Sequence, residues 1–174
     1  CQVYTWRNNL ALDVFEVTPP PDPLFETERW QRAEDHLRQA LAGRLDLAAA
    51  LEEKIACLRP VQAAVDHRPP RVVVNNSVSG FFTIIEVFAH DFPGLLYRVT
   101  DALLHCRLDI WVARVATHVD QVVDIFYVRD FDGQKVDRPD LVAAIEETVM
   151  TVLRQGPDAP IPDPDAPCKG DPTP

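Results

Sequence analysis

The fold is decided by residues 81–106, which read FFTIIEVFAHDFPGLLYRVTDALLHC. Phe81 to Ala89 are mainly β-branched and aromatic residues, and they predict a strand. The next four residues, Asp91-Phe92-Pro93-Gly94, predict a turn. From Leu95 to Cys106 the apolar residues recur at the three-and-four spacing of one buried helix face. The stretch therefore predicts a strand, a tight turn and an amphipathic helix in succession.

The residues after this stretch continue the pattern. Leu108 to His118 and Gln121 to Arg129 predict a hairpin, and Asp137 to Gln155 predict a helix that Gly156 ends. The order β-α-β-β-α matches the first five elements of a ferredoxin-like βαββαβ sandwich, an α+β fold with helices on one face of an antiparallel sheet. No closing strand is evident after Gly156. Either Val72 to Val74 serve one of the units of the chain or one edge of the sheet stays open.

An internal repeat precedes this unit. Val3-Tyr4-Thr5, a turn and Leu12-Asp13-Val14-Phe15-Glu16-Val17 recur as Val115-Ala116-Thr117, a turn and Val123-Asp124-Ile125-Phe126-Tyr127-Val128. The offset is 112 residues before the turn and 111 after it. We therefore expect two homologous units, the first without its opening strand and helix.

The remaining segments set the expected boundaries. Thr27 and Asp46 are expected to cap two helices, the first with a buried face at Trp30, Ala33, Leu37 and Leu41. Residues 157–174 contain seven prolines and four aspartates, which predict a disordered tail. The expected organisation is the end of a first unit at 1–76, a second unit at 77–156 and the tail at 157–174. Because residue 1 is Cys and no element precedes its strand, we expect a piece of a longer chain.

The last predicted strand has two apolar faces. Val123, Ile125 and Tyr127 alternate along it with Val122, Phe126 and Val128. A sheet covered on one side only would show apolar and polar residues in alternation. We therefore expect paired sheets or side-by-side strands, within the chain or between chains.

Composition excludes several classes of protein. The 174 residues include 27 acidic and 17 Lys or Arg residues, for a net charge of -10. Binding to nucleic acid needs the opposite sign, and no apolar run reaches the roughly 18 residues of a membrane span. The four scattered cysteines fit reduced thiols, so we expect a cytoplasmic protein without nucleic-acid or membrane partners.

The turn is the most informative candidate site. Asp91, Phe92, Pro93, Gly94 and Leu95 join a strand to a helix whose first N–H groups can hold a small carboxylate. The alternative is that Asp91 caps the helix, Gly94 serves the turn, and nothing binds. We find no phosphate loop, nucleophile elbow or metal-ligand pattern, so we expect neither catalytic residues nor a metal site.

Three charged residues lie within predicted strands. Glu86, Arg114 and Asp124 are expected to approach one another in the sheet, and Asp13 repeats Asp124 in the first unit. A strand-to-strand ion pair with Arg114 is the simpler interpretation. The alternative is that Arg114 meets the carboxylate of a ligand or partner.

These motifs together resemble the ACT domain family. The residues that carry the resemblance are Thr83 to Val87, Asp91 to Val99, Leu108 to Ile110, Ala113 to Thr117 and Val123 to Val128. Within that family, residues 1–155 are similar to the C-terminal pair of ACT domains in bifunctional PII uridylyltransferase/uridylyl-removing enzymes. Asn9 to Phe15 and Leu41 to Leu47 extend the similarity to the first domain of the pair.

The resemblance implies a regulatory region that senses an amino acid, in this family glutamine, and controls uridylylation of the PII signalling protein. It implies a ligand site with two parts. Asp91 to Leu95 form the loop that one domain contributes, and Asp109 and Ile110 mark the strand start that a neighbouring domain contributes. The neighbour is another ACT domain, in the same chain or a second copy. Catalytic domains and their Mg²⁺ would lie upstream, so no cofactor is expected here. The alternatives are an assembly module that binds nothing and the sensor of a different amino-acid-regulated enzyme.

Overall fold

The computed structural model describes residues 1–6, 8, 10–17, 22–57, 69–118, 121–157 and 159–162. Contacts within the chain divide it into two units. The larger consists of Cys1–Phe15 and Val61–Pro174, and the smaller is Glu16–Pro60. We describe each unit by itself.

The larger unit contains an antiparallel sheet whose strands do not follow one another in chain order. Its described strands number six, in the spatial order β2-β1-β5-β6-β4-β3, and every neighbouring pair is antiparallel. Their bounds are β1 Gln2–Thr5, β2 Ala11–Val14, β3 Arg71–Asn75, β4 Thr83–His90, β5 Leu108–His118 and β6 Gln121–Asp130. The α+β class and the antiparallel sheet predicted from the sequence are confirmed, and the arrangement is compatible with a ferredoxin-like fold.

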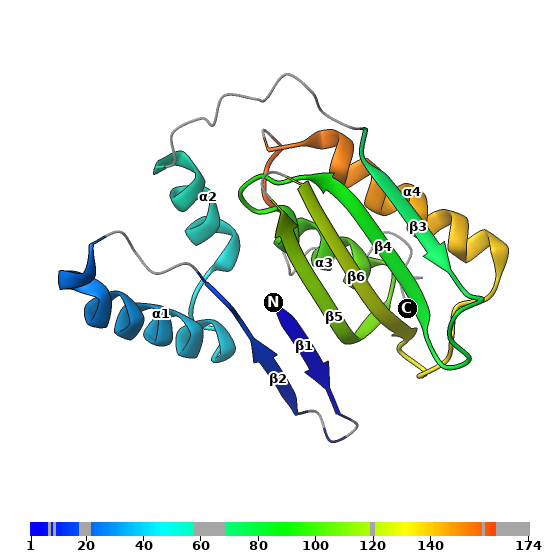
Figure 1. The fold of residues 1–174 in the computed structure, drawn as a ribbon, viewed down its shortest axis with the longest axis horizontal. Coiled ribbons are helices and arrows are strands. Elements are labelled where there is room, and N and C mark those ends of the chain that lie inside the picture. The colour runs from blue at the N-terminus through cyan, green and yellow to red at the C-terminus, as the bar shows by residue number, and fades with distance from the viewer. Residues whose placement is uncertain are drawn as a thin grey trace, which may run out of the picture. The chain divides into compact units, whose positions relative to one another are not determined.

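Two helices, α3 (Leu95–His105) and α4 (Pro139–Gln155), cover one face of this sheet (Figure 1). The helix α3 buries Leu95, Val99, Ala102 and Leu103, the one-sided spacing that its sequence predicts. These side chains and those of α4 pack on the sheet around Phe126, which is fully buried. Gly156 follows α4 with a φ of 67°, a backbone conformation that favours glycine.

The closing strand comes from upstream. Val72 lies opposite Val87 and Val74 opposite Ile85, so β3 pairs with β4 at the edge of the sheet. The Val74 N–H also donates to the Glu146 side chain of α4 at 3.2 Å. Of the two alternatives that the sequence leaves open, the first is correct: Val72 to Val74 serve this sheet, as its edge strand. The expected boundary between 76 and 77 falls between β3 and the strand that it pairs with.

The two hairpins of the internal repeat have the same register. Val3 lies opposite Asp13 in the first hairpin, and Val115 lies opposite Asp124 in the second. Thr5 lies opposite Ala11, as Thr117 lies opposite Val122. The hairpins also lie side by side, because β1 pairs with β5 through Val3 and Ala113. The expectation of side-by-side strands is confirmed within the chain.

The smaller unit is helical where it is described. A 3-10 turn, η1 (Pro23–Phe25), leads into α1 (Glu26–Leu41), and α2 (Leu47–Cys57) follows. Asp46 caps α2 as predicted, since its carboxylate accepts the Ala49 N–H at 2.9 Å. Thr27 does not cap α1, which begins one residue earlier without a side-chain cap. The face expected to be buried is not, because none of the residues of α1 is buried. The described part of the unit contains no sheet against which that face could pack.

Part of the expected tail has tertiary contacts. Residues 159–162 form neither helix nor strand, yet Ile161 is buried and its neighbours bond to α3. Residues 163–174 lie outside the described part of the chain, so disorder there stays a prediction. No helix among the described residues is long and apolar enough to cross a membrane.

Candidate functional site

The predicted binding loop lies between β4 and α3. Gly94 stands at the start of the helix with a φ of 87°, which a residue with a side chain rarely adopts. The Leu95 N–H donates to the Phe92 carbonyl at 3.1 Å, and this bond closes the turn. Asp91 and Pro93 are exposed, whereas Leu95 is buried in the core. The loop is therefore an ordered corner with its outer residues facing solvent.

The start of α3 has no side-chain cap. Its capping position is Gly94, and the helix has no side-chain cap hydrogen bond. The alternative in which Asp91 caps this helix is therefore not what the structure shows. The first regular helical bond joins the Arg98 N–H to the Gly94 carbonyl at 3.1 Å. A helix start of this kind carries partial positive charge and favours an anion.

Asp124 brings a buried carboxyl group to the same region. It lies on the helix-covered face of β6 opposite Val115, is 1% exposed, and one of its oxygens, Oδ1, has no hydrogen-bond partner. Burial raises the pKa of Asp124 to about 7. A backbone hydrogen bond from Ala116 lowers this pKa, and the negative charge of Asp91 raises it. A buried acid with an unused oxygen is thus electrostatically coupled to the 91–95 loop.

Asp109 and Ile110 lie at the other end of the sheet. Asp109 pairs with Arg129 near the end of β6. His90, which comes just before the loop, pairs with Gln121 at the start of β6. Eight residues of strand separate these two positions, or about 26 Å. The structure therefore does not bring Asp109 and Ile110 together with Asp91 to Leu95 inside one unit. The expectation that the two parts of a ligand site come from neighbouring domains stays a prediction.

The three charged residues do not form the expected cluster. Glu86 and Arg114 both lie opposite Ile125 on the face of the sheet away from the helices, one on each side of it. Asp124 points to the helix-covered face. The described residues form no ion pair among these three side chains. Arg114 is exposed, so its role toward a partner stays a prediction.

Two features of the molecule were not expected from the sequence. Arg98, 2% exposed, and Tyr97 bond to residues 159–162. Arg98 follows Leu95 at the spacing of the buried helix face. A cation on that face is the feature of the sequence that could have indicated a bonded side chain at this position. The second feature is a surface cavity beside Asp109, lined in part by Thr5, Trp6, Trp111 and Arg129. No pattern in the sequence links these residues.

The described residues offer no metal centre. Among them, no group of three or more His, Cys, Asp or Glu side chains could hold a metal ion. The predicted site combines backbone N–H groups, a glycine corner and a buried carboxyl. Such groups can bind and orient a small zwitterion, which carries one charge of each sign.

Comparison with known proteins gives a consistent set of relatives. The chain is 37% identical over 157 residues to the bifunctional uridylyltransferase/uridylyl-removing enzyme of Gluconobacter oxydans, a match that covers 90% of this chain. It is 38% identical over 150 residues to the enzyme of the same name from Novosphingobium aromaticivorans, and 34% identical over 154 residues to that from Azospirillum brasilense. The chain spans only 16% of the length of each of these relatives. No protein-family model and no solved structure matches the chain.

Proposed function

We propose that this chain is the C-terminal, amino-acid-sensing ACT region of a PII uridylyltransferase/uridylyl-removing enzyme, with glutamine as the effector. The chain is homologous to one region of enzymes with that name, over 86–90% of its own length in the three relatives above. The α+β sheet with two helices on one face is compatible with an ACT fold. The choice of glutamine rests on the family that the motifs resemble.

The observation that carries the proposal is the unpartnered Asp124 oxygen beside a helix start without a side-chain cap. An α-amino acid has an ammonium group and a carboxylate two bonds apart. The carboxylate would bind at the N–H groups that begin α3, and the ammonium group would bind near Asp124 and Asp91. Gly94 allows close approach, because no side chain projects from the corner.

The second part of the site comes from a neighbouring strand in this proposal. Because β1 is antiparallel to β5, its first residues lie toward the same end of the sheet as the 91–95 loop. Cys1 exchanges backbone bonds with Val115, the cross-strand partner of Asp124.

Regulation would work by differential affinity. Glutamine would bind one arrangement of the paired domains better than another, and this preference would bias distant active sites. Those sites, the PII substrate and any Mg²⁺ belong to the complete enzyme in this proposal. The groups described above supply binding and orientation and perform no chemical step.

A competing function is assembly without a ligand. The pairing of β1 with β5 favours it, because this pairing joins two hairpins into one sheet through backbone contacts. The two functions differ in what glutamine does to the protein. An assembly module gives no saturable heat with glutamine, whereas a sensor does.

Titration calorimetry on the folded chain tests the proposal. We expect saturable heat with glutamine at millimolar concentration and a much weaker response to asparagine or glutamate. Gly94→Val should abolish the glutamine heat while the helical circular dichroism persists, because it blocks the corner. Gly43→Val is the matched control, since Gly43 also has a positive φ, of 64°, but lies at the end of α1. Equal heats for wild type and Gly94→Val would overturn the site.

A further inference from the structure

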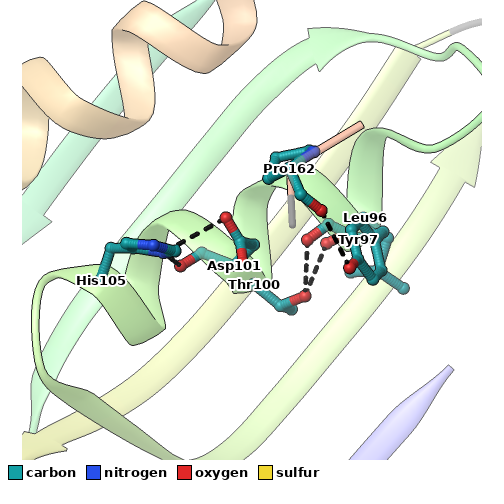
Figure 2. Close-up of polar contacts among 6 residues, drawn as sticks. All are labelled: Leu96, Tyr97, Thr100, Asp101, His105 and Pro162. Atoms are coloured by element: carbon teal, nitrogen blue, oxygen red, sulfur yellow. Dashed lines mark hydrogen bonds and ion pairs between the residues drawn. The ribbon is translucent and has the colours of Figure 1, made fainter. Parts of the chain in front are cut away.

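Residues 159–162, which form neither helix nor strand, contact α3 through three hydrogen bonds. The Arg98 guanidinium donates to the carbonyl of Pro160 at 2.8 Å and to that of Ala159. The Tyr97 hydroxyl donates to the Pro162 carbonyl at 3.2 Å, as Figure 2 shows. Ile161, between the two prolines, is 8% exposed. Three carbonyls and one apolar side chain of a four-residue segment are therefore bound by the protein.

The chemistry of these contacts defines what the surface recognises. Each of these three bonds runs from a side-chain donor of α3 to a backbone carbonyl of the segment. Proline has no N–H, so Pro160 and Pro162 can offer only acceptors. Their fixed φ also favours the extended conformation that displays those acceptors. The surface thus matches an extended peptide with an apolar residue between two prolines.

The position of these contacts links the segment to the start of α3. Tyr97 and Arg98 stand in the first turn of the helix, and the Arg98 backbone N–H bonds to the Gly94 carbonyl at 3.1 Å. The same residue therefore holds the segment with its side chain and the glycine corner with its backbone. A segment docked on Arg98 restrains the residues that lead into the helix.

We propose that Tyr97 and Arg98 form a docking surface for an extended, proline-flanked apolar peptide, that residues 159–162 occupy it, and that docking restrains the start of α3. The segment makes no helix or strand ladder bonds, so it belongs to the part of a fold that opens locally before the core does. Opening would release the first turn of α3 and the 91–95 loop together. The proposal does not depend on the identity of any ligand.

Hydrogen exchange on two truncations tests this restraint. A chain that stops after residue 157 lacks the segment, whereas a chain that stops after residue 162 keeps it and is the matched control. We expect amides in residues 92–99 to exchange at least about tenfold faster in the shorter chain and at the wild-type rate in the control. Exchange in β6, in the centre of the sheet, should be equal in both. Equal exchange in residues 92–99 of both truncations would overturn the proposal.

Point variants of the full chain cover the case in which the shorter truncation is unstable. Ile161→Asp places a charge where the apolar side chain is buried, and we expect it to speed exchange in residues 92–99 as the truncation does. Tyr97→Phe removes one bond to the segment and should give a smaller increase. Wild-type exchange in both variants would contradict the proposal.

Addition of the segment as a separate peptide completes the test. A capped peptide of residues 157–164 should restore slow exchange to the shorter truncation at millimolar concentration, since the covalent link normally supplies a high effective concentration. The same peptide with Ile161→Asp should not. Failure of the wild-type peptide to restore protection or to shift the NMR signals of Tyr97 and Arg98 would show that no such docking surface exists.

Discussion

The two hairpins of this chain have the same register and opposite environments. Phe126 in the β5–β6 hairpin is fully buried between the sheet and its helices, whereas the equivalent Phe15, just beyond β2, is 61% exposed. Every residue of β2 is exposed. Local sequence therefore determines the pairing within each hairpin, but neighbouring elements determine what each side chain contributes. The helices α3 and α4 and the strand β4 surround the β5–β6 hairpin, whereas the first hairpin contributes Val3 alone to the partly buried side chains that pack against this core.

The aspartates of the two hairpins show the chemical consequence. Asp13 and Asp124 occupy equivalent positions opposite a valine. Asp13 is exposed, whereas Asp124 is buried and its pKa is raised to about 7. The same residue in the same register is thus exposed to solvent in one hairpin and a buried candidate ligand group in the other.

The largest expected contrast is between Phe126→Ala and Phe15→Ala. The first leaves a cavity in the core and should lower the free energy of unfolding by about 3–5 kcal/mol. The second changes an exposed side chain and should alter it by no more than about 0.5 kcal/mol. Urea denaturation of both variants measures the difference. Similar losses for both would show that the first hairpin is as deeply packed as the second.

The next contrast is between Asp124→Asn and Asp13→Asn. Because the folded pKa of Asp124 is about 7, above the ordinary 3.8, the folded state keeps a proton that the unfolded state releases. Wild-type stability should therefore fall as pH rises from about 4 to about 7 and then level off, by up to about 4 kcal/mol.

Asn cannot ionise, so Asp124→Asn should flatten this dependence and be more stable than wild type at pH 8. Asp13→Asn, the matched control, should follow the wild-type curve at every pH. Denaturation curves between pH 4 and pH 8 provide the measurement. A wild-type curve that rises with pH over this range, or an unchanged curve for Asp124→Asn, contradicts the burial of that carboxyl.

In the smallest contrast, the substitution in the first hairpin is the one expected to lower stability, and that in the second hairpin is the control. Thr5 in β1 donates its hydroxyl to the Ile110 carbonyl of β5 at 3.0 Å, whereas the equivalent Thr117 is exposed. Thr5→Val should cost about 1 kcal/mol by removing a bond between the two hairpins. Thr117→Val should be close to neutral. Thermal unfolding of the pair resolves this difference, and equal melting temperatures would argue against the side-by-side pairing.

Local features of the fold could be predicted from the sequence. The strand, turn and helix from Thr83 to His105, the hairpin that follows and the register of the repeat all depend on residues close in the chain. Asp46 begins one helix and Gly156 ends another, both where expected, because caps act through neighbouring backbone groups. The glycine corner at Gly94 was predictable for the same reason.

Features that depend on distant residues could not be predicted. Pairing of Val72 with Val87 joins segments on either side of the expected boundary at residue 76, and the sequence leaves this pairing as one of two alternatives. The burial of Asp124 depends on elements from both sides of it in the chain. Proline-rich composition predicts disorder after Gly156, but the donors that bind residues 159–162 lie more than 60 residues away.

The most direct test of the account is a glutamine titration, followed by NMR, of wild type, Asp124→Asn and the control Asp13→Asn at pH 6 and pH 8. If the ligand ammonium binds the ionised Asp124, whose pKa is about 7, wild-type affinity should rise about tenfold between these pH values. Shifts should centre on Gly94 and Leu95, Asp13→Asn should match wild type, and Asp124→Asn should bind weakly at both pH values. Absence of saturable shifts, or equal affinity of wild type and Asp124→Asn at pH 8, would contradict the account.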